Sequence, residues 1–198
     1  MKHTISCRDS VYGNQDEAFR LLPDAGITHT EITRIEPDRV AEVQKNAASR
    51  GVTISTIGSG VDLGDENSMA TYRRLIDAVS AAKIRLLFTS VKGKDEAARP
   101  AYLERLRSLA EHAHKRGVTI CMETHPPFGT NARTAIETLT AINSPALGFN
   151  FDTANIYYYN QGTTAVKELQ EVRNRVVTVH LKDTDGGFKS GNFPVIGQ

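Results

Sequence analysis

The chain has 198 residues, and its 24 lysines and arginines nearly balance 23 aspartates and glutamates, so a net charge of +1 gives no electrostatic basis for nucleic acid or membrane as the main partner. The stretch MKHTISCRDS lacks the apolar core of a signal peptide, and no stretch approaches the roughly 20 apolar residues of a membrane span. Cys7 and Cys121 lack zinc-site spacing and are predicted to be buried free thiols in a cytoplasmic protein.

Short β-branched stretches alternate with longer amphipathic stretches along the chain. The predicted strands are residues 3–7, 27–32, 52–57, 84–90, 118–123, 147–152 and 176–181. The predicted helices are residues 15–26, 37–51, 67–82, 101–117, 132–142 and 164–174. Gly26, Gly51 and Gly117 each stand between a helical pattern and a strand, where glycine commonly ends a helix. Seven such units without a break in composition predict one α/β domain with parallel strands.

Two α/β architectures fit this alternation. A doubly wound sheet that binds a dinucleotide needs GxGxxG after its first strand, and RDSVYGNQDEAF has no such pattern. The glycine-containing stretch 58–64 has the wrong spacing and is predicted to be a flexible loop. The alternative is a (β/α)8 TIM barrel, whose catalytic residues lie at the carboxyl ends of several strands. The absence of a dinucleotide motif favours the barrel.

The last three predicted strands each have an apolar face, expected to pack on outer helices, and a polar face. These polar faces end in Glu123, Asp152 and His180, which follow one another at intervals of about one βα unit. The three side chains should therefore converge at one rim of the barrel. Two carboxylates and an imidazole in one cleft need a cation between them. The pattern predicts one divalent metal ion, and mixed oxygen and nitrogen ligands suit Mn²⁺, Mg²⁺, Co²⁺ or Zn²⁺.

Other polar residues stand near these positions. Glu31 ends the second predicted strand, where it fits a substrate-binding or ligand-supporting role and a salt bridge equally well. His125 and Asn155 are predicted to contact substrate hydroxyls. Lys182 lies on the same side of its strand as the imidazole, so its ammonium can bind a substrate hydroxyl or stabilise an enediolate oxygen. An ion pair with Asp183 or another neighbour is the alternative role for Lys182.

The stretches ICMETHPP, GFNFDTANI and VHLKD resemble the xylose isomerase-like TIM-barrel superfamily of sugar isomerases and epimerases. The resemblance covers essentially the whole chain, but only these three motifs are specific. In that family a Glu, an Asp, a His and a final Glu bind one divalent metal ion, and the first three correspond to Glu123, Asp152 and His180. The last Glu belongs to the eighth strand, and this sequence ends at GNFPVIGQ without a counterpart.

The resemblance implies removal of a proton next to a carbonyl of a ketose, an aldose or a related polyol-ketone, with Glu123 as the base and Lys182 as a second catalytic residue. Reprotonation then gives epimerisation or aldose–ketose isomerisation. Loss of a β-hydroxyl would instead make the protein an inosose dehydratase-like lyase. A catalytically idle barrel that binds a sugar or a protein partner is a third hypothesis, kept open by the missing fourth ligand.

The same superfamily contains AP endonucleases with several zinc ions. Those enzymes have a histidine three residues after the Asp, where this chain has Asn155, and a further Asp-x-His. No histidine follows His180 in this chain. The sequence therefore disfavours a phosphodiesterase that acts on nucleic acid.

The length of the chain leads to one more expectation. A complete (β/α)8 barrel typically needs about 250 residues. The chain is therefore predicted to be a barrel truncated after the seventh strand, a single domain over residues 1–198 without the eighth βα unit. The open edge of its seventh strand would invite pairing with another chain, so a homo-oligomer is among the expected assemblies.

Overall fold

A computed structural model describes residues 3–197 and contains one seven-stranded parallel sheet in the order β1-β2-β3-β4-β5-β6-β7. The strands are β1 (Cys7–Arg8), β2 (His29–Thr33), β3 (Thr53–Asp62), β4 (Leu86–Lys92), β5 (Thr119–Glu123), β6 (Leu147–Asp152) and β7 (Val176–His180). The α-helices are α1 (Gln15–Asp24), α2 (Val40–Ser49), α3 (Glu66–Ala81), α4 (Arg99–Lys115), α5 (Ala132–Ile142), α6 (Thr153–Tyr159) and α7 (Ala165–Val172). Four 3₁₀ turns are η1 (Asp9–Tyr12), η2 (Pro37–Arg39), η3 (Glu96–Ala98) and η4 (Arg173–Arg175).

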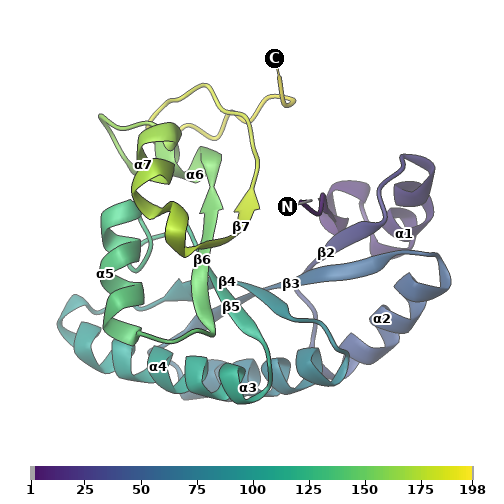
Figure 1. The fold of residues 1–198 in the computed structure, drawn as a ribbon, viewed down its shortest axis with the longest axis horizontal. Coiled ribbons are helices and arrows are strands. Elements are labelled where there is room, and N and C mark those ends of the chain that lie inside the picture. The colour runs from purple at the N-terminus through teal and green to yellow at the C-terminus, as the bar shows by residue number, and fades with distance from the viewer. Residues whose placement is uncertain (1–2, 198) are drawn as a thin grey trace.

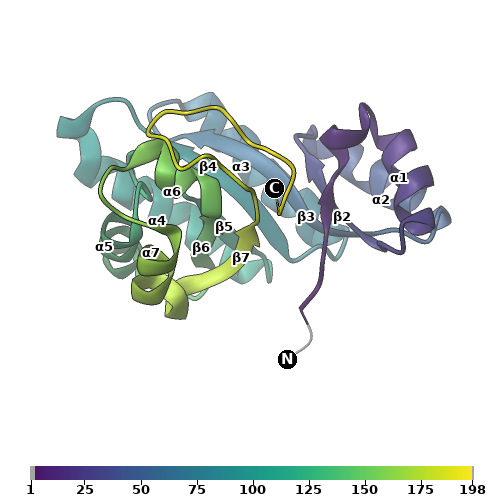
Figure 2. The ribbon, with the colours of Figure 1, turned by 90° about the horizontal axis from the view of Figure 1, so that it is seen from above.

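The sheet curls into an open barrel with the helices on its convex side (Figure 1). Each strand pairs with its neighbours in sequence, and within residues 3–197 β7 forms no ladder with β1. β7 nevertheless meets β2 through side chains, because His180 Nε2 lies 3.1 Å from Glu31 Oε2. The predicted barrel architecture with seven parallel strands is confirmed. Seen from above, β1 and β2 lie beside β3, away from β6 and β7 (Figure 2).

The glycine-containing stretch after residue 57 is strand rather than loop, so the loop prediction was wrong. β3 continues through Asp62 and pairs with β4 along its carboxyl half. The ladder to β4 satisfies the backbone hydrogen bonds that a loop would leave to solvent. Gly58 also suits this position because an added Cβ would lie 3.2 Å from the backbone oxygen of Ile32. The first strand is shorter than predicted and begins only at Cys7.

The helix after β6 was not predicted. α6 has seven residues and begins directly after Asp152, whose side chain caps it. The expected packing of outer helices on β7 is also not found within the described residues. Val177 and Val179 on β7 are 46% and 51% exposed. The apolar face of β7 is therefore on the surface of this structure.

The expected role of three glycines is confirmed, and the expected burial of two free thiols is confirmed for Cys121 but was wrong for Cys7. Gly26, Gly51 and Gly117 have φ values of +72°, +72° and +68°, the left-handed conformation that suits glycine after a helix. Cys121 is buried and Cys7 half-buried, both as free thiols. No helix among residues 3–197 combines the length and the apolar character needed to cross a membrane.

The core lies between the convex side of the sheet and the helices. Phe149 and Phe151 on β6 both point into it, with ring centroids 6.3 Å apart. We expect Phe151→Ala to lower the free energy of unfolding by about 3–5 kcal/mol, because the change leaves a cavity in a close-packed core. Urea denaturation would measure this. Phe188→Ala is the control, since Phe188 is 44% exposed and should cost less than about 1 kcal/mol. If Phe151→Ala lowered the free energy of unfolding no more than Phe188→Ala does, Phe151 would not be packed in the core.

Candidate active site

Five side chains of alternating charge form a row across the concave side of the sheet. Arg8 Nε lies 3.1 Å from Glu31 Oε1, and Glu31 Oε2 lies 3.1 Å from His180 Nε2. On its other side, His180 Nδ1 lies 3.8 Å from Asp152 Oδ2. The same carboxylate oxygen lies 2.6 Å from Lys182 Nζ. The row connects β1 and β2 with β6 and β7 at their carboxyl ends, where the active sites of TIM barrels lie.

Burial and charge set the protonation of this row. Burial acts to lower the pKa of His180, but hydrogen bonding and charge from Asp152 and Glu31 outweigh it and raise the pKa to about 9. Burial likewise acts to raise the pKa of Asp152, but His180 and Lys182 hold it below its usual value. At neutral pH the imidazole is therefore positively charged and the Asp152 carboxyl negatively charged, so each stabilises the other.

The two oxygens of Asp152 have different roles. Oδ1 accepts hydrogen bonds from the backbone N–H groups of Ala154 (3.1 Å) and Asn155 (3.0 Å) and so caps α6. Oδ2 is buried and has no partner in hydrogen-bond geometry among residues 3–197, although the Lys182 ammonium lies within ion-pair distance. One oxygen is therefore structural and the other faces the site.

Glu123 lies at the end of β5 and is held from two sides. The Ser90 hydroxyl on β4 donates to Oε2, and the side-chain amide of Asn155 donates to Oε1 at 3.4 Å. The same amide donates to the backbone oxygen of Thr124 at 2.9 Å. Because the backbone N–H of Asn155 is bound to Asp152, this residue links the two carboxylates. The arrangement fixes the direction of the Glu123 carboxylate.

Aromatic side chains border the row and the Glu123 carboxylate. The ring centroid of Phe88 on β4 lies 4.4 Å from that of His180. The guanidinium carbon of Arg8 lies 5.9 Å from the same Phe88 centroid. His125 packs edge-on against Tyr159 with centroids 5.2 Å apart. Burial and the charge of Glu123 raise the pKa of Tyr159, so its hydroxyl stays protonated at neutral pH.

The donor chemistry of this site fits a divalent cation. Asp152 Oδ2 is buried without a hydrogen bond, and a histidine nitrogen lies beside it. A cationic group, the Lys182 ammonium, already lies against this oxygen. Within residues 3–197, however, no three His, Cys, Asp or Glu side chains lie close enough together to hold a metal ion as they stand. A metal ion would therefore have to replace the ammonium and the imidazole proton as the partner of the carboxylate.

The structure brings most of the sequence-predicted site residues to one place. Those in the row or bonded to one of its members are Glu31, Asp152, Asn155, His180 and Lys182. Glu123 joins them through Asn155, whereas His125 contacts Tyr159 and bonds to none of them. Lys182 pairs with a neighbour, Asp152, rather than with Asp183.

Three residues of the site were missed, namely Arg8, Ser90 and Phe88. Arg8 directly follows the first predicted strand, and Ser90 is the last residue of the fourth. The same rule of polar residues at strand ends would have found both, had it been applied to every strand. Phe88 carried no signal, because an aromatic residue within a strand usually belongs to the core.

Of two cavities formed by residues 3–197, only the second is lined by a member of the row. One of about 500 Å³ opens between β3 and α3 and is bordered by Arg34 and Lys92. The other, of about 380 Å³, is bordered by Lys182 and the segment that follows it. Neither is lined by Glu123, Asp152 or His180, so the ionisable groups locate the site better than the cavities do.

The raised pKa of His180 predicts how stability depends on pH in the metal-free protein. A pKa raised from 6.5 to about 9 on folding stabilises the protein fully below pH 6.5, and this contribution is lost as the pH rises through about 9. The free energy of unfolding should therefore fall by up to about 3 kcal/mol between these limits. Urea denaturation with a chelator present would measure it. His180→Gln should remove this fall, and an unchanged pH dependence in that variant would contradict the assignment.

Known proteins are similar to the chain over nearly its whole length. The family model "Xylose isomerase-like TIM barrel" matches residues 18–197, while no curated protein matches the chain. The solved structure of a xylose isomerase domain protein from Planctomyces limnophilus is 18% identical, with a TM-score of 0.76 over 90% of this chain and 73% of that one.

Two further solved structures have the same fold. A xylose isomerase-like TIM barrel protein from Mycobacterium smegmatis in complex with magnesium is 19% identical, with a TM-score of 0.73 over 93% of this chain and 78% of that one. A D-allulose 3-epimerase from Methylomonas sp. in complex with D-allulose is 16% identical, with a TM-score of 0.75 over 91% of this chain and 72% of that one. At such identities the likeness shows the fold alone.

Proposed function

Because the chain belongs to the xylose isomerase-like TIM barrel family, we propose that it is a divalent-metal-dependent sugar isomerase or epimerase. The observation that carries the proposal is the meeting of Asp152 and His180 at the carboxyl ends of β6 and β7, with Glu123 joined to them through Asn155. The similar structures support it, since they include a D-allulose 3-epimerase with its sugar, an L-ribulose 3-epimerase and a magnesium complex.

Asp152, His180 and Glu123 would hold the metal ion, through two carboxylates and an imidazole. When bound, Mn²⁺, Mg²⁺, Co²⁺ or Zn²⁺ would polarise the substrate carbonyl and lower the cost of negative charge on its oxygen. Asp152 suits this role because only one of its oxygens is used to cap α6. Glu31 would orient the His180 ring through the nitrogen that it already contacts.

Glu123 is the proposed base that takes the proton from the carbon next to the carbonyl. The Ser90 hydroxyl and the Asn155 amide fix the direction of its carboxylate, so the proton acceptor is oriented before the substrate arrives. A proton delivered by water to the same carbon from the other face gives an epimer. Transfer of the proton from Glu123 to the adjacent carbon, with a proton moving from the hydroxyl to the carbonyl oxygen, gives the aldose–ketose isomer.

Lys182 is the proposed donor to the substrate oxygen that gains charge. In the metal-free structure its ammonium lies against Asp152 and 5.6 Å from the Phe193 ring centroid, and a metal ion that takes its place at Asp152 would leave it free to bind the substrate. A fixed ammonium near a developing oxyanion lowers the barrier to proton removal. His125 and Asn155 are the proposed contacts for substrate hydroxyls.

Product analysis tests the proposal. The metal-loaded chain, incubated with ketoses, aldoses and inososes, should convert a sugar into its isomer or epimer, as resolved by NMR spectroscopy. Formation of a dehydrated product instead would indicate the lyase, and sugar binding without any product would indicate the idle barrel. Either of these results would contradict the isomerase or epimerase proposal.

A further inference from the structure

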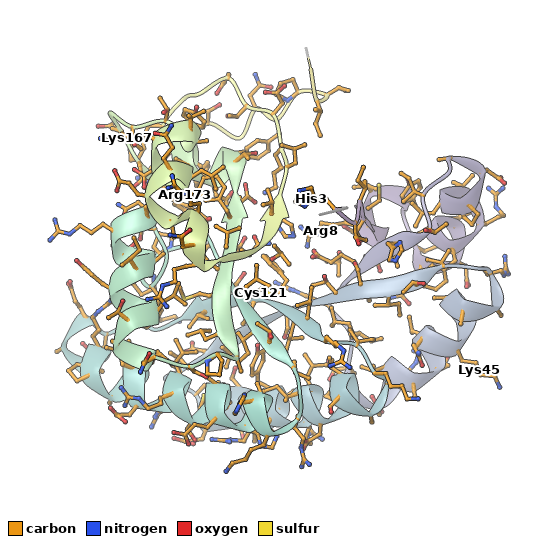
Figure 3. The ribbon with its side chains drawn as sticks, viewed as in Figure 1. His3, Arg8, Lys45, Cys121, Lys167 and Arg173 are labelled. Carbon is orange, nitrogen blue, oxygen red and sulfur yellow. The ribbon has the colours of Figure 1, made fainter. Side chains whose placement is uncertain are left out.

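The Arg8 side chain is not needed for the proposed chemistry, yet it lies in the site. Arg8 ends β1, and its side chain lies between β7 and the β1–β2 end of the sheet (Figure 3). Its side chain is 36% exposed. Among the described residues 3–197, Glu31 is the only charged group that Arg8 pairs with, and its two terminal nitrogens donate no hydrogen bond. The outer edge of the guanidinium is therefore available to a ligand.

The charge of Arg8 is only partly neutralised. Glu31 divides its two oxygens between Arg8 at Oε1 and His180 at Oε2. The contact between Arg8 Nε and Glu31 is at ion-pair distance but not in hydrogen-bond geometry. A guanidinium that shares its single carboxylate with another cation can accept a second anion. The planar edge of arginine binds carboxylate and phosphate groups with two parallel hydrogen bonds.

Arg8 also lies within the reach of a substrate held at the proposed reaction centre. The centroid of the Phe88 ring lies 4.4 Å from that of His180 and 5.9 Å from the guanidinium carbon of Arg8, so both groups lie near one ring. On the neighbouring strand β3, Gly58 and Gly60 pair with Phe88 and Ser90 and so share their face of the sheet. The Phe88 ring already packs over Gly58, where an added Cβ would lie 3.6 Å from Phe88 Cδ1.

We propose that the substrate is a sugar with an anionic group, carboxylate or phosphate, at the end remote from its reacting carbonyl, and that Arg8 binds this group. The inference rests on the proposed function, because it takes the reacting carbonyl to lie near Glu123 and His180. It adds the class of substrate and a residue that selects it. Arg8 acts on binding and not on the chemical step.

Binding of three matched ligands tests this inference. D-fructose, D-fructose 6-phosphate and D-fructuronate differ in the group at one end, and isothermal titration calorimetry with the metal-loaded chain gives their affinities. We expect both anionic ligands to bind more tightly than D-fructose. Arg8→Gln should weaken the anionic ligands by about 10- to 100-fold, because a charge-assisted hydrogen bond is lost, and D-fructose by less than about twofold.

Two further variants make the result specific. Arg34→Gln removes an exposed arginine at the border of the 500 Å³ cavity and should leave all three affinities unchanged. Arg8→Lys keeps the charge and loses the planar edge, so it should weaken the anionic ligands by less than Arg8→Gln does. Arg8→Lys also gives the answer if Arg8→Gln fails to fold.

The outcomes separate this inference from the proposed function. Equal affinity for the three ligands, the same loss for D-fructose as for the anionic pair, or binding of none of them would overturn the inference. Anion binding that depends on Arg8, without any isomer or epimer formed, would contradict the proposed function and support the inference. The tighter of the two anionic ligands identifies carboxylate or phosphate as the group.

Discussion

Glu123→Gln should reduce the exchange of the substrate α-proton with solvent by about 10²- to 10⁴-fold, the usual contribution of a positioned base. The amide keeps the size of the side chain and can still accept from the Ser90 hydroxyl, so the local structure should remain. What it lacks is the basic carboxylate that takes the proton. Proton exchange, followed by NMR spectroscopy at saturating Mn²⁺, is the measurement.

The saturating metal separates the role of Glu123 as base from its role as ligand. Glu137→Gln is the matched control, because Glu137 lies on α5 and pairs only with Arg133 on the surface within the described residues. The control should exchange the proton at the wild-type rate. Exchange by Glu123→Gln within about tenfold of wild type, below the range expected for loss of a base, would show that another group takes the proton.

Asp152→Asn should weaken Mn²⁺ binding by at least about 100-fold, more than the loss of a residue that only supports a ligand. The change is chosen to spare the fold. Asparagine caps a helix about as well as aspartate, so the hydrogen bonds to Ala154 and Asn155 should persist. The charged oxygen Oδ2, which faces the site, is what the variant loses. Calorimetric titration of the chelator-treated protein with Mn²⁺ measures the affinity.

His180→Ala should weaken Mn²⁺ binding similarly, and Asp77→Asn serves as the control for loss of one carboxylate. Asp77 pairs with His112 and Arg116 on the outside of the barrel, so its variant should bind Mn²⁺ as wild type does. Melting temperatures report whether each variant remains folded. Unchanged Mn²⁺ affinity in both Asp152→Asn and His180→Ala would show that these two residues do not bind the metal ion.

The barrel could be predicted because its signals are local and repeated. In the strands and most helices, apolar residues recur with the spacing expected for that element. Gly26, Gly51 and Gly117 mark where helices end. The same local rules failed at Gly58 and Gly60. Glycine alone indicates a loop, but pairing with β4 on one side makes the segment a strand, and pairing of this kind is not local in sequence.

The short helix α6 was missed for a related reason. Asp152 carried two signals, a strand-final metal ligand and a helix N-cap, and only the first was used. The structure shows the cap at Oδ1 and an ion pair with Lys182 at Oδ2, while the role as a metal ligand remains a prediction. Aspartate is a common residue both at metal sites and at helix N-caps. Its presence at a strand end therefore does not tell from sequence alone that a helix begins there.

The candidate site was predictable in its members on β5, β6 and β7 but not in their pairing. Glu123, Asp152 and His180 follow from alternation along single strands. The contact of His180 with Glu31 joins residues 149 positions apart, and only the curvature of the sheet brings them together. The role of these residues as metal ligands remains a prediction.

The measurement that tests the account most directly is exchange of a sugar α-proton with solvent deuterium by the wild-type chain. Ketoses and inososes in deuterium oxide, with Mn²⁺ or with a chelator, would be followed by NMR spectroscopy. The account predicts deuterium at the carbon next to the carbonyl of at least one sugar, in the presence of Mn²⁺ and not of the chelator. Sugar binding with no deuterium incorporated into any of them would contradict it.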